Sequence, residues 1–236
     1  MRTVILAGGL GTRLSEETRN KPKPMVSIGG FPILWHIIKT YEFYNQNEFI
    51  IAGGYKQTHI KNFLLKKSKF NSKIELIDTG LFTNTGGRLL RLKKFLKNNT
   101  FMLTYGDGLA NININKLINF HKKNKSLATI TVVRPPARWG YVKLNNNTVS
   151  KFEEKNQLNE GWINGGFFVF EPEIFDYIKK GDSTILEHDV LPALSKKKFL
   201  KAYKHQGFWQ CMDNLRDKKL LEKFWKQKNP PWKVWK

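Results

Sequence analysis

The chain of 236 residues carries 41 Lys and Arg against 19 Asp and Glu, which gives a formal net charge of +22. Its hydrophobic fraction of 40% supports a real core, but no apolar run reaches the ~18 to 20 residues that a membrane span needs. Cys211 is the single cysteine, and the five histidines lack the HxH and HExxH spacings of zinc sites. We therefore expect one domain with no disulfide, transition-metal site or membrane partner. Because the chain enters a strand at once, without a signal-peptide pattern, we expect a cytoplasmic protein.

The excess of basic residues raises the question of a nucleic-acid partner, because Lys and Arg gain affinity by releasing counterions from phosphates. The lysines, however, are scattered in pairs and triplets along most of the chain, among many asparagines. No zinc-finger, helix-turn-helix or RNA-binding motif accompanies them. The pattern is typical of solvated faces, and no dedicated nucleic-acid partner is predicted.

Short apolar strands alternate with helix-like segments through the first half of the chain. Strands are predicted at residues 3–7, 49–52, 74–77, 101–105 and 128–133, and helices at residues 33–44, 57–65, 88–96 and 115–123. This alternation predicts an α/β, Rossmann-like fold with a mostly parallel sheet covered by helices on both faces. Ligands of such sheets bind at the carboxyl ends of the strands.

The second half has a different texture, with strands predicted at residues 141–144, 149–152, 166–170 and 200–203 and helices at residues 185–194 and 214–226. Asn145-Asn146-Asn147 is a turn signal that predicts a hairpin. The tryptophan-rich tail from Pro230 is expected to pack on this domain or on a neighbouring subunit. We expect residues 1–125 to be mainly a nucleotide-binding half, and residues 126–236 mainly a sugar-phosphate-binding half with the C-terminal helix.

The first predicted strand ends in a glycine loop, which reads Gly8-Gly9-Leu10-Gly11-Thr12-Arg13. Glycines let the backbone point amide N–H groups at a ligand, and Arg13 and Lys23 add positive charge for a polyphosphate. The spacing fits neither a Walker A loop nor the dinucleotide fingerprint, whose third glycine would fall at Leu14. A tight turn within an ordinary α/β domain is the alternative at this point.

Two aspartates are candidates for Mg²⁺. Asp107 ends a predicted strand between two glycines, and Asp213 precedes the last predicted helix. Magnesium takes one or two protein carboxylates together with waters and substrate phosphates. Each aspartate can instead cap the helix that follows it, and for Asp213 local pattern alone favours the cap.

A second glycine loop, Thr83-Asn84-Thr85-Gly86-Gly87-Arg88, opens a predicted helix and suits a nucleobase or phosphate contact. A glycine-rich turn with an exposed Arg88 is the alternative. Lys155 offers a cation for a sugar phosphate, and Asn164-Gly165 offers an amide and backbone groups for sugar hydroxyls.

Taken together, these motifs resemble the sugar-phosphate nucleotidyltransferases over nearly the whole chain, and details such as Ser15-Glu16-Glu17-Thr18 and Trp35-His36 favour the cytidylyl branch. The resemblance implies Mg²⁺-dependent transfer of CMP from CTP to a sugar 1-phosphate, first of all glucose 1-phosphate. It implies a nucleotide site formed by Leu6, Ala7, Gly8, Gly9, Leu10, Gly11, Thr12, Arg13, Lys23, Thr83, Arg88 and Gly106. It further implies sugar-phosphate contacts by Lys155, Asn164 and Gly165, metal ligands Asp107 and Asp213, catalytic roles for Arg13, Lys23 and Asp107, and a homo-oligomer.

The sequence departs from that family in the segment from Lys61 to Lys73, which is much shorter than the corresponding stretch of the cytidylyl members. Asn156 and Cys211 stand where the family usually has proline, but neither replaces an implied ligand. Three alternatives stay open: another sugar 1-phosphate, another nucleotide such as UTP or dTTP, and a non-catalytic nucleotide-sugar sensor.

Overall fold

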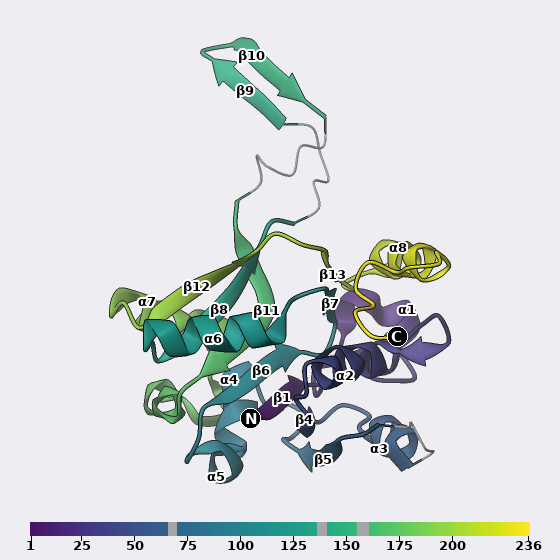
Figure 1. The fold of residues 1–236 in the computed structure, drawn as a ribbon, viewed down its shortest axis with the longest axis vertical. Helices are drawn as coiled ribbons and strands as arrows, with labels where there is room; N and C mark the ends of the chain where they lie inside the picture. Colours follow the sequence, from purple (N-terminus) through teal and green to yellow (C-terminus); the bar gives the residue numbers. More distant parts are fainter. Residues whose placement is uncertain (66–69, 136–140, 155–160) are drawn as a thin grey trace.

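The computed structural model describes the chain except for residues 66–69, 136–140 and 155–160. Its centre is a seven-stranded sheet in the order β12-β8-β11-β6-β1-β4-β5 (Figure 1). The strands are β1 (Arg2–Leu6), β4 (Glu48–Gly53), β5 (Lys73–Asp78), β6 (Phe101–Tyr105), β8 (Ala128–Val133), β11 (Ile163–Phe170) and β12 (Leu200–His205). All pairs are parallel except those of β11 with β6 and β8. The predicted α/β fold with a mostly parallel sheet is confirmed.

Helices cover both faces of this sheet because the strand side chains alternate between two buried cores. In β1, Ile5 belongs to the core under α2 (Ile33–Phe43), α3 (Thr58–Leu65), α6 (Ile114–Asn124) and α8 (Leu215–Trp225). Its neighbour Val4 points to the opposite core, under α4 (Thr85–Arg91), α5 (Lys93–Leu96) and α7 (Leu191–Lys196). In the described part of the chain, no helix has the length and apolar character that a membrane crossing needs.

Short elements complete the described chain. They are η1 (Thr12–Leu14), α1 (Ser15–Thr18), η2 (Lys23–Met25), β2 (Ser27–Ile28), β3 (Phe31–Pro32), β7 (Gly108–Ala110), η4 (Pro172–Tyr177), η5 (Gly181–Ser183), the π-helical turn η6 (Leu186–Val190) and β13 (Trp209–Cys211). Except for η6, which with α7 occupies the place of the helix predicted at residues 185–194, these elements are too short for a sequence period to reveal them.

The helix predicted at residues 88–96 begins earlier and is broken. It starts at Thr85 and divides at Leu92 into α4 and α5. The chain at Asp182 runs so close that a Cβ at Gly87 would lie 2.5 Å from the Asp182 carbonyl oxygen. The two glycines that argue against a helix at this point therefore serve a close backbone approach.

The predicted hairpin forms from β9 (Tyr141–Asn145) and β10 (Thr148–Glu153), and Asn146 has the positive φ of 50° that the turn needs. Figure 1 shows it standing away from the sheet as an arm. β11 contributes Asn164 to the wall of a cavity, whereas no residue of this arm lines that cavity.

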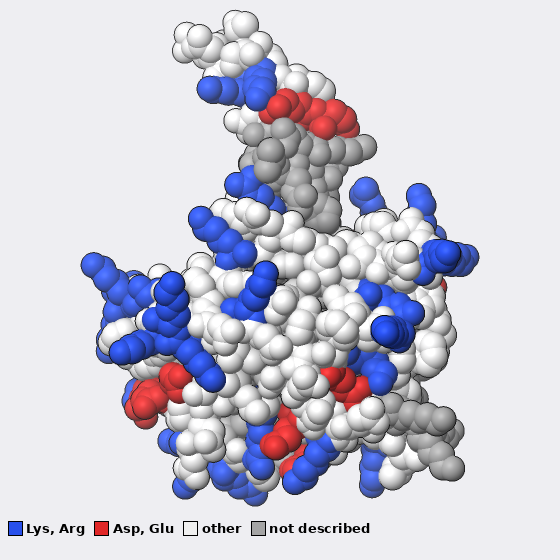
Figure 2. All heavy atoms as spheres, in the orientation of Figure 1, with Lys and Arg blue, Asp and Glu red and all other residues white. Residues whose placement is uncertain are grey.

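Lysine and arginine side chains are spread over the visible face, with the densest group near α6, α7 and β12 (Figure 2). β12 is an edge strand, and it carries Lys201 and Lys204. Charged side chains on an edge strand discourage pairing with another sheet. Part of the basic charge near β12 therefore disfavours pairing of this edge strand with another sheet.

The tryptophan-rich tail packs on this domain, as expected. Trp232 is fully buried, and its indole stacks with Phe208 and Trp225. The Trp232 Nε1–H points at Nδ1 of the buried His36, at 3.4 Å, while His36 Nε2 lies 2.9 Å from the Ile28 carbonyl oxygen. Because an indole can only donate and a carbonyl can only accept, His36 is neutral and carries its proton on Nε2.

We expect His36 to make the folded state sensitive to acid. Burial lowers the pKa of His36 from 6.5 to about 4, so its neutral form contributes its full stabilisation above pH 6.5. As the pH falls from 6.5 to 4, His36 binds a proton in the unfolded chain but not in the folded chain. The free energy of unfolding therefore falls by about 3 kcal/mol. Urea unfolding from pH 7.5 to 4 measures this loss. His36→Gln should remove that component of the pH dependence, whereas the same change at the exposed His188 should retain it.

Candidate active site

Most of the predicted site residues meet in one cavity of about 560 Å³ at the carboxyl ends of β1 and β6. The predicted residues that line it are Leu6, Ala7, Gly8, Gly9, Gly11, Thr12, Arg13, Lys23, Thr83, Arg88, Gly106, Asp107 and Asn164. The wall also contains Pro24, Asn84, Thr85, Tyr105 and Glu187, which were not predicted. Leu10, Gly165 and Asp213 lie outside this lining, and Lys155 lies outside the described residues.

The glycine loop follows β1 and lies against Arg88. A Cβ at Gly8 would collide with the Arg88 guanidinium and would lie 2.8 Å from the Gly53 carbonyl oxygen. Gly11 has a φ of +69°, in the left-handed region that favours glycine. Both glycines are therefore required by the backbone path, and that path places the loop on the cavity wall.

Arg88 is only 4% exposed, and its guanidinium binds the loops around it. Nη1 donates to the carbonyl oxygens of Gly53 and Gly80 and to the Thr79 hydroxyl, at 2.7 to 3.0 Å. Nη2 donates to the Gly8 carbonyl at 2.8 Å, and burial lowers the pKa of this guanidinium. Arg88 thus joins the glycine loop to the ends of β4 and β5, a structural role that the glycine-rich pattern did not reveal.

Lys23 brings the two candidate metal ligands together. Its Nζ lies 2.7 Å from Asp107 Oδ2 and 2.7 Å from Asp213 Oδ1, and Arg13 Nη1 lies 2.9 Å from Asp213 Oδ2. Burial opposes the charge on Lys23, but Asp107 and Asp213 outweigh it and raise the pKa of the ammonium. Burial likewise opposes the charge on Asp213, yet Lys23 and Arg13 together lower the pKa of that carboxyl. At neutral pH Lys23 is therefore a cation and Asp213 a carboxylate.

The pairing of β7 with β13 explains why Asp107 and Asp213 meet across 106 positions of sequence. Asp107 immediately precedes β7, and Met212 alone separates Asp213 from the end of β13. The two strands are antiparallel. Met212 N also donates to the Asp107 carbonyl oxygen at 2.9 Å. With only three residues each, β7 and β13 have no sequence signal strong enough to predict them.

Neither aspartate is a helix cap. The residue after Asp107 begins a strand, and the N-cap of α8 is Asn214, whose Oδ1 accepts from Asp217 N at 3.0 Å. Both carboxylates are therefore directed to the cation cluster, and the alternative reading of them as caps is wrong.

The chemistry of this pair fits Mg²⁺. No cluster of three or more His, Cys, Asp or Glu side chains occurs among the described residues, so this part of the chain offers no all-protein metal cage. Two hard carboxylates that already converge on one cation, beside a cavity open to phosphates, match the way Mg²⁺ is usually held. Cys211 is no competing nucleophile, because burial, with a contribution from Asp213, raises the pKa of its thiol to about 12.

On the opposite wall, Asn164 lies next to Tyr105 and Glu187. Asn164 Nδ2 donates to the Tyr105 hydroxyl oxygen at 2.9 Å, and the Tyr105 hydroxyl donates to Glu187 Oε1. The Gly165 carbonyl accepts from Trp209 Nε1 at 2.8 Å, so this group is already engaged. Glu187 follows no motif, and only its place on the wall identifies it.

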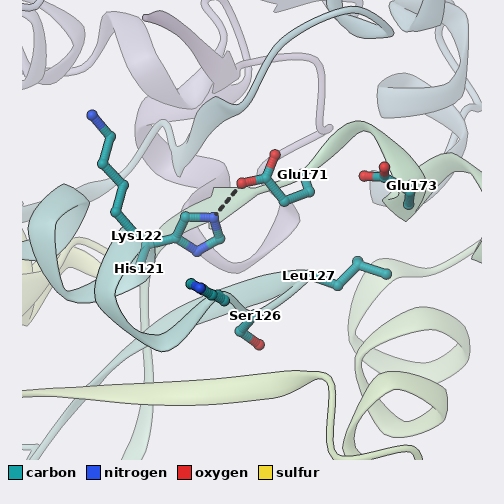
Figure 3. A pocket seen from close by; sticks show the side chains of 7 residues that line it. His121, Lys122, Ser126, Leu127, Glu171 and Glu173 are labelled. Carbon is teal, nitrogen blue, oxygen red and sulfur yellow. Dashed lines mark hydrogen bonds and ion pairs between the residues drawn. The ribbon is translucent and has the colours of Figure 1, made fainter.

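A second cavity, of about 490 Å³, lies at the opposite end of the strands, where β8 begins and β11 ends (Figure 3). Its central feature is His121, whose Nε2 is 2.9 Å from Glu171 Oε1 and whose Nδ1 is 2.9 Å from the Thr129 hydroxyl. Thr100 donates to the other oxygen of Glu171. These contacts fasten α6 to the sheet, and none of the predicted site residues lines this cavity.

The family model described as "Nucleotidyl transferase" matches residues 2–217. The chain belongs to the nucleotidyl transferase family. Among its relatives, a "Glucose-1-phosphate cytidylyltransferase" of Salmonella typhimurium is 44% identical, and a "Probable glucose-1-phosphate cytidylyltransferase" of Bacillus subtilis is 41% identical. In both comparisons the match covers 100% of each chain.

A solved structure gives the same picture of this nucleotidyl transferase fold. HddC from Yersinia pseudotuberculosis, complexed with GMP-PN, superposes with a TM-score of 0.76 at 27% identity, over 95% of this chain and 99% of HddC. The family that the sequence motifs resemble is thus confirmed both by sequence and by structure.

Proposed function

We propose that this nucleotidyltransferase transfers CMP from CTP to α-D-glucose 1-phosphate, forming CDP-glucose and pyrophosphate. The observation that carries the proposal is that Lys23 and Asp107 share one cavity with the glycine loop, while Lys23 also binds Asp213 just outside its lining. The choice of CTP and of glucose is supported by the full-length relatives at 44% and 41% identity.

In this reaction a phosphate oxygen of the sugar 1-phosphate forms a bond to the α-phosphorus of CTP. The bond from that phosphorus to the bridging oxygen breaks, and pyrophosphate leaves with the electron pair. No covalent bond to the protein is needed, so the chain contributes position and charge. Both substrates are anionic, and the cations on the wall offset their repulsion.

We assign the positive groups to the nucleotide phosphates. Arg13, whose side chain is 75% exposed, is accessible to the leaving β- and γ-phosphates together with the N–H groups of the loop. Lys23, which stays protonated at neutral pH, is assigned to the α-phosphate. Asp107 and Asp213 would hold Mg²⁺, which supplies charge neutralisation for the reacting phosphates when it is bound.

The remaining assignments divide the site between the two halves of the chain. Residues 1–125 would mainly hold the nucleotide, through Leu6 to Thr12, Thr83, Arg88 and Gly106. Residues 126–236 would mainly hold the sugar phosphate, through Lys155, Asn164 and Gly165. Arg88 would act by holding the loops in place, because its guanidinium donates to the Thr79 hydroxyl and to backbone carbonyls.

We further propose a cytoplasmic homo-oligomer. The side chain of Phe82 is 85% exposed beside Thr83, and a large apolar side chain at the rim of a site suits a subunit contact. Sedimentation equilibrium measures the mass of the particle. A monomer at all concentrations would contradict the oligomer and would leave the proposed reaction unaffected.

The proposed reaction is tested by pyrophosphate release across a panel of CTP, UTP, dTTP and GTP, each with several hexose 1-phosphates and Mg²⁺. We expect CTP with glucose 1-phosphate to give the highest kcat/KM, and EDTA to abolish release. Efficient release with another nucleotide or sugar would correct the substrate. No release from any pair would favour a non-catalytic sensor.

A further inference from the structure

Glu187 occupies a wall of the proposed active site, although no motif points to it. It belongs to η6, the π-helical turn that leads into α7, and its carboxylate lines the same cavity as Lys23 and Asn164. Turns of this kind are rare and occur often at functional sites. The question is what this carboxylate does there.

Two hydroxyl groups hold the Glu187 carboxylate from opposite sides. Oε1 accepts from the Tyr105 hydroxyl, and Oε2 accepts from Thr85 Oγ1 at 2.7 Å. Thr85 Oγ1 in turn accepts from Leu186 N at 2.9 Å, which fixes the direction of its own proton. Glu187 therefore connects α4, through Thr85, with β6, through Tyr105.

Two groups fix the orientation of the Asn164 amide, the Tyr105 hydroxyl and the Gly166 N–H. A tyrosine hydroxyl has one proton, and here Glu187 takes it, so the Tyr105 oxygen can only accept from Asn164. Asn164 must then turn Nδ2 toward Tyr105 and Oδ1 toward Gly166 N, which donates to it at 2.8 Å. Among the described contacts, one Nδ2–H and one lone pair of Oδ1 stay available to a ligand.

The backbone is shaped around this contact. Gly166 has a φ of +79°, and a Cβ there would lie 2.7 Å from the Tyr105 ring. The register of β11 against β8 also shifts between Asn164 and Phe168, so the strand is distorted next to Asn164. Burial, together with Glu187, raises the pKa of Tyr105, so its hydroxyl keeps the proton that it donates.

We propose that Glu187 is a positioning residue for sugar discrimination. Through the Tyr105 hydroxyl it secures one of the two anchors of the Asn164 amide, the other being Gly166 N–H, and thereby the arrangement of hexose hydroxyls that the site accepts. This inference rests on the proposed function, which places the sugar 1-phosphate against Asn164. It adds that the sugar selectivity of Asn164 depends on the Glu187 carboxylate, which reaches Asn164 through the Tyr105 hydroxyl.

Glu187→Gln tests the proposal with little change of shape. The amide can donate where the carboxylate accepts, so the Tyr105 proton is free to turn toward Asn164, and the Asn164 amide is then held only by the Gly166 N–H. We expect kcat/KM for glucose 1-phosphate to fall about 30-fold, mainly through KM, while KM for CTP stays within about twofold. The preference for glucose 1-phosphate over galactose 1-phosphate should fall about tenfold.

A double-mutant cycle separates positioning from a structural role. If Glu187 acts through Asn164, then Glu187→Gln should cost less than about twofold when Asn164→Ala is already present. Asp189→Asn is the matched control on the same turn, because Asp189 binds Lys180 and Ile185 N outside the cavity. It should leave the sugar KM and the glucose preference unchanged.

Two results would overturn the positioning role. One is additive losses of kcat/KM in the double variant, and the other is an equal rise of the KM for glucose 1-phosphate and the KM for CTP in Glu187→Gln. Wild-type protein that releases no pyrophosphate from CTP and glucose 1-phosphate would count against the proposed function instead. In that case, titration calorimetry measures the Kd of CDP-glucose for the wild type and the three variants, which gives the same double-mutant cycle for binding. If the wild type does not bind CDP-glucose either, the inference fails together with the proposed function.

Discussion

Asp107→Asn should lower kcat for pyrophosphate release by about 10³-fold or more, because it removes one of the two proposed Mg²⁺ ligands and a charge at the reacting phosphates. The substitution keeps the size of the side chain. Asp213 continues to pair with Lys23 at 2.7 Å, so the folded state should persist. The rate of pyrophosphate release at several Mg²⁺ concentrations measures the effect, and thermal unfolding checks the fold.

Asp176→Asn is the control for this change, because Asp176 is an exposed acid in η4, next to the opposite edge of the sheet. It should keep the wild-type rate. In Asp107→Asn, the Mg²⁺ concentration for half-maximal rate should rise as well. Full rate in the Asp107 variant at ordinary Mg²⁺ would mean that this carboxylate takes no part in the reaction.

Arg88→Lys should destabilise the protein by about 3 kcal/mol and raise KM for CTP by at least about tenfold. A lysine ammonium is a single point charge, and it cannot reach the Gly8, Gly53 and Gly80 carbonyls at once as the guanidinium does. Buried carbonyls then lose their partners, and the glycine loop loses its connection to β4. Urea unfolding and the KM for CTP report the two effects.

Arg91→Lys, one turn further along α4, is the matched comparison. Arg91 pairs with Asp182 at the surface, where solvent screens the two charges and the pair contributes little to stability. It should therefore unfold near the wild-type urea concentration and keep the wild-type KM. If Arg88→Lys behaved in the same way as Arg91→Lys, the structural role of the Arg88 guanidinium would be refuted.

The sheet could be predicted from the sequence because each strand carries its own apolar run, bounded by polar or glycine residues. That is true of β1, β4, β6 and β8, and the rule for parallel sheets then places Gly8 and Asp107 at one edge. A βα alternation carries this information locally, before any tertiary contact forms.

The parts that escaped prediction depend on contacts between distant segments. The three-residue strands β7 and β13 bring Asp213 to Lys23, and local pattern alone favoured a helix cap at Asp213. Arg88 has the same sequence context whether its guanidinium faces solvent or binds the glycine loop and the ends of β4 and β5. Glu187 enters the site only because η6 packs beside α4, which no period in the sequence encodes.

The most direct test of the account is the identity of the product that wild-type protein makes from CTP, glucose 1-phosphate and Mg²⁺, followed by ³¹P NMR. The account predicts loss of the β- and γ-phosphate signals of CTP, and the appearance of pyrophosphate and of a diphosphate diester, CDP-glucose, in equal amounts. Orthophosphate release without a diester, or an unchanged CTP spectrum after prolonged incubation, would contradict it.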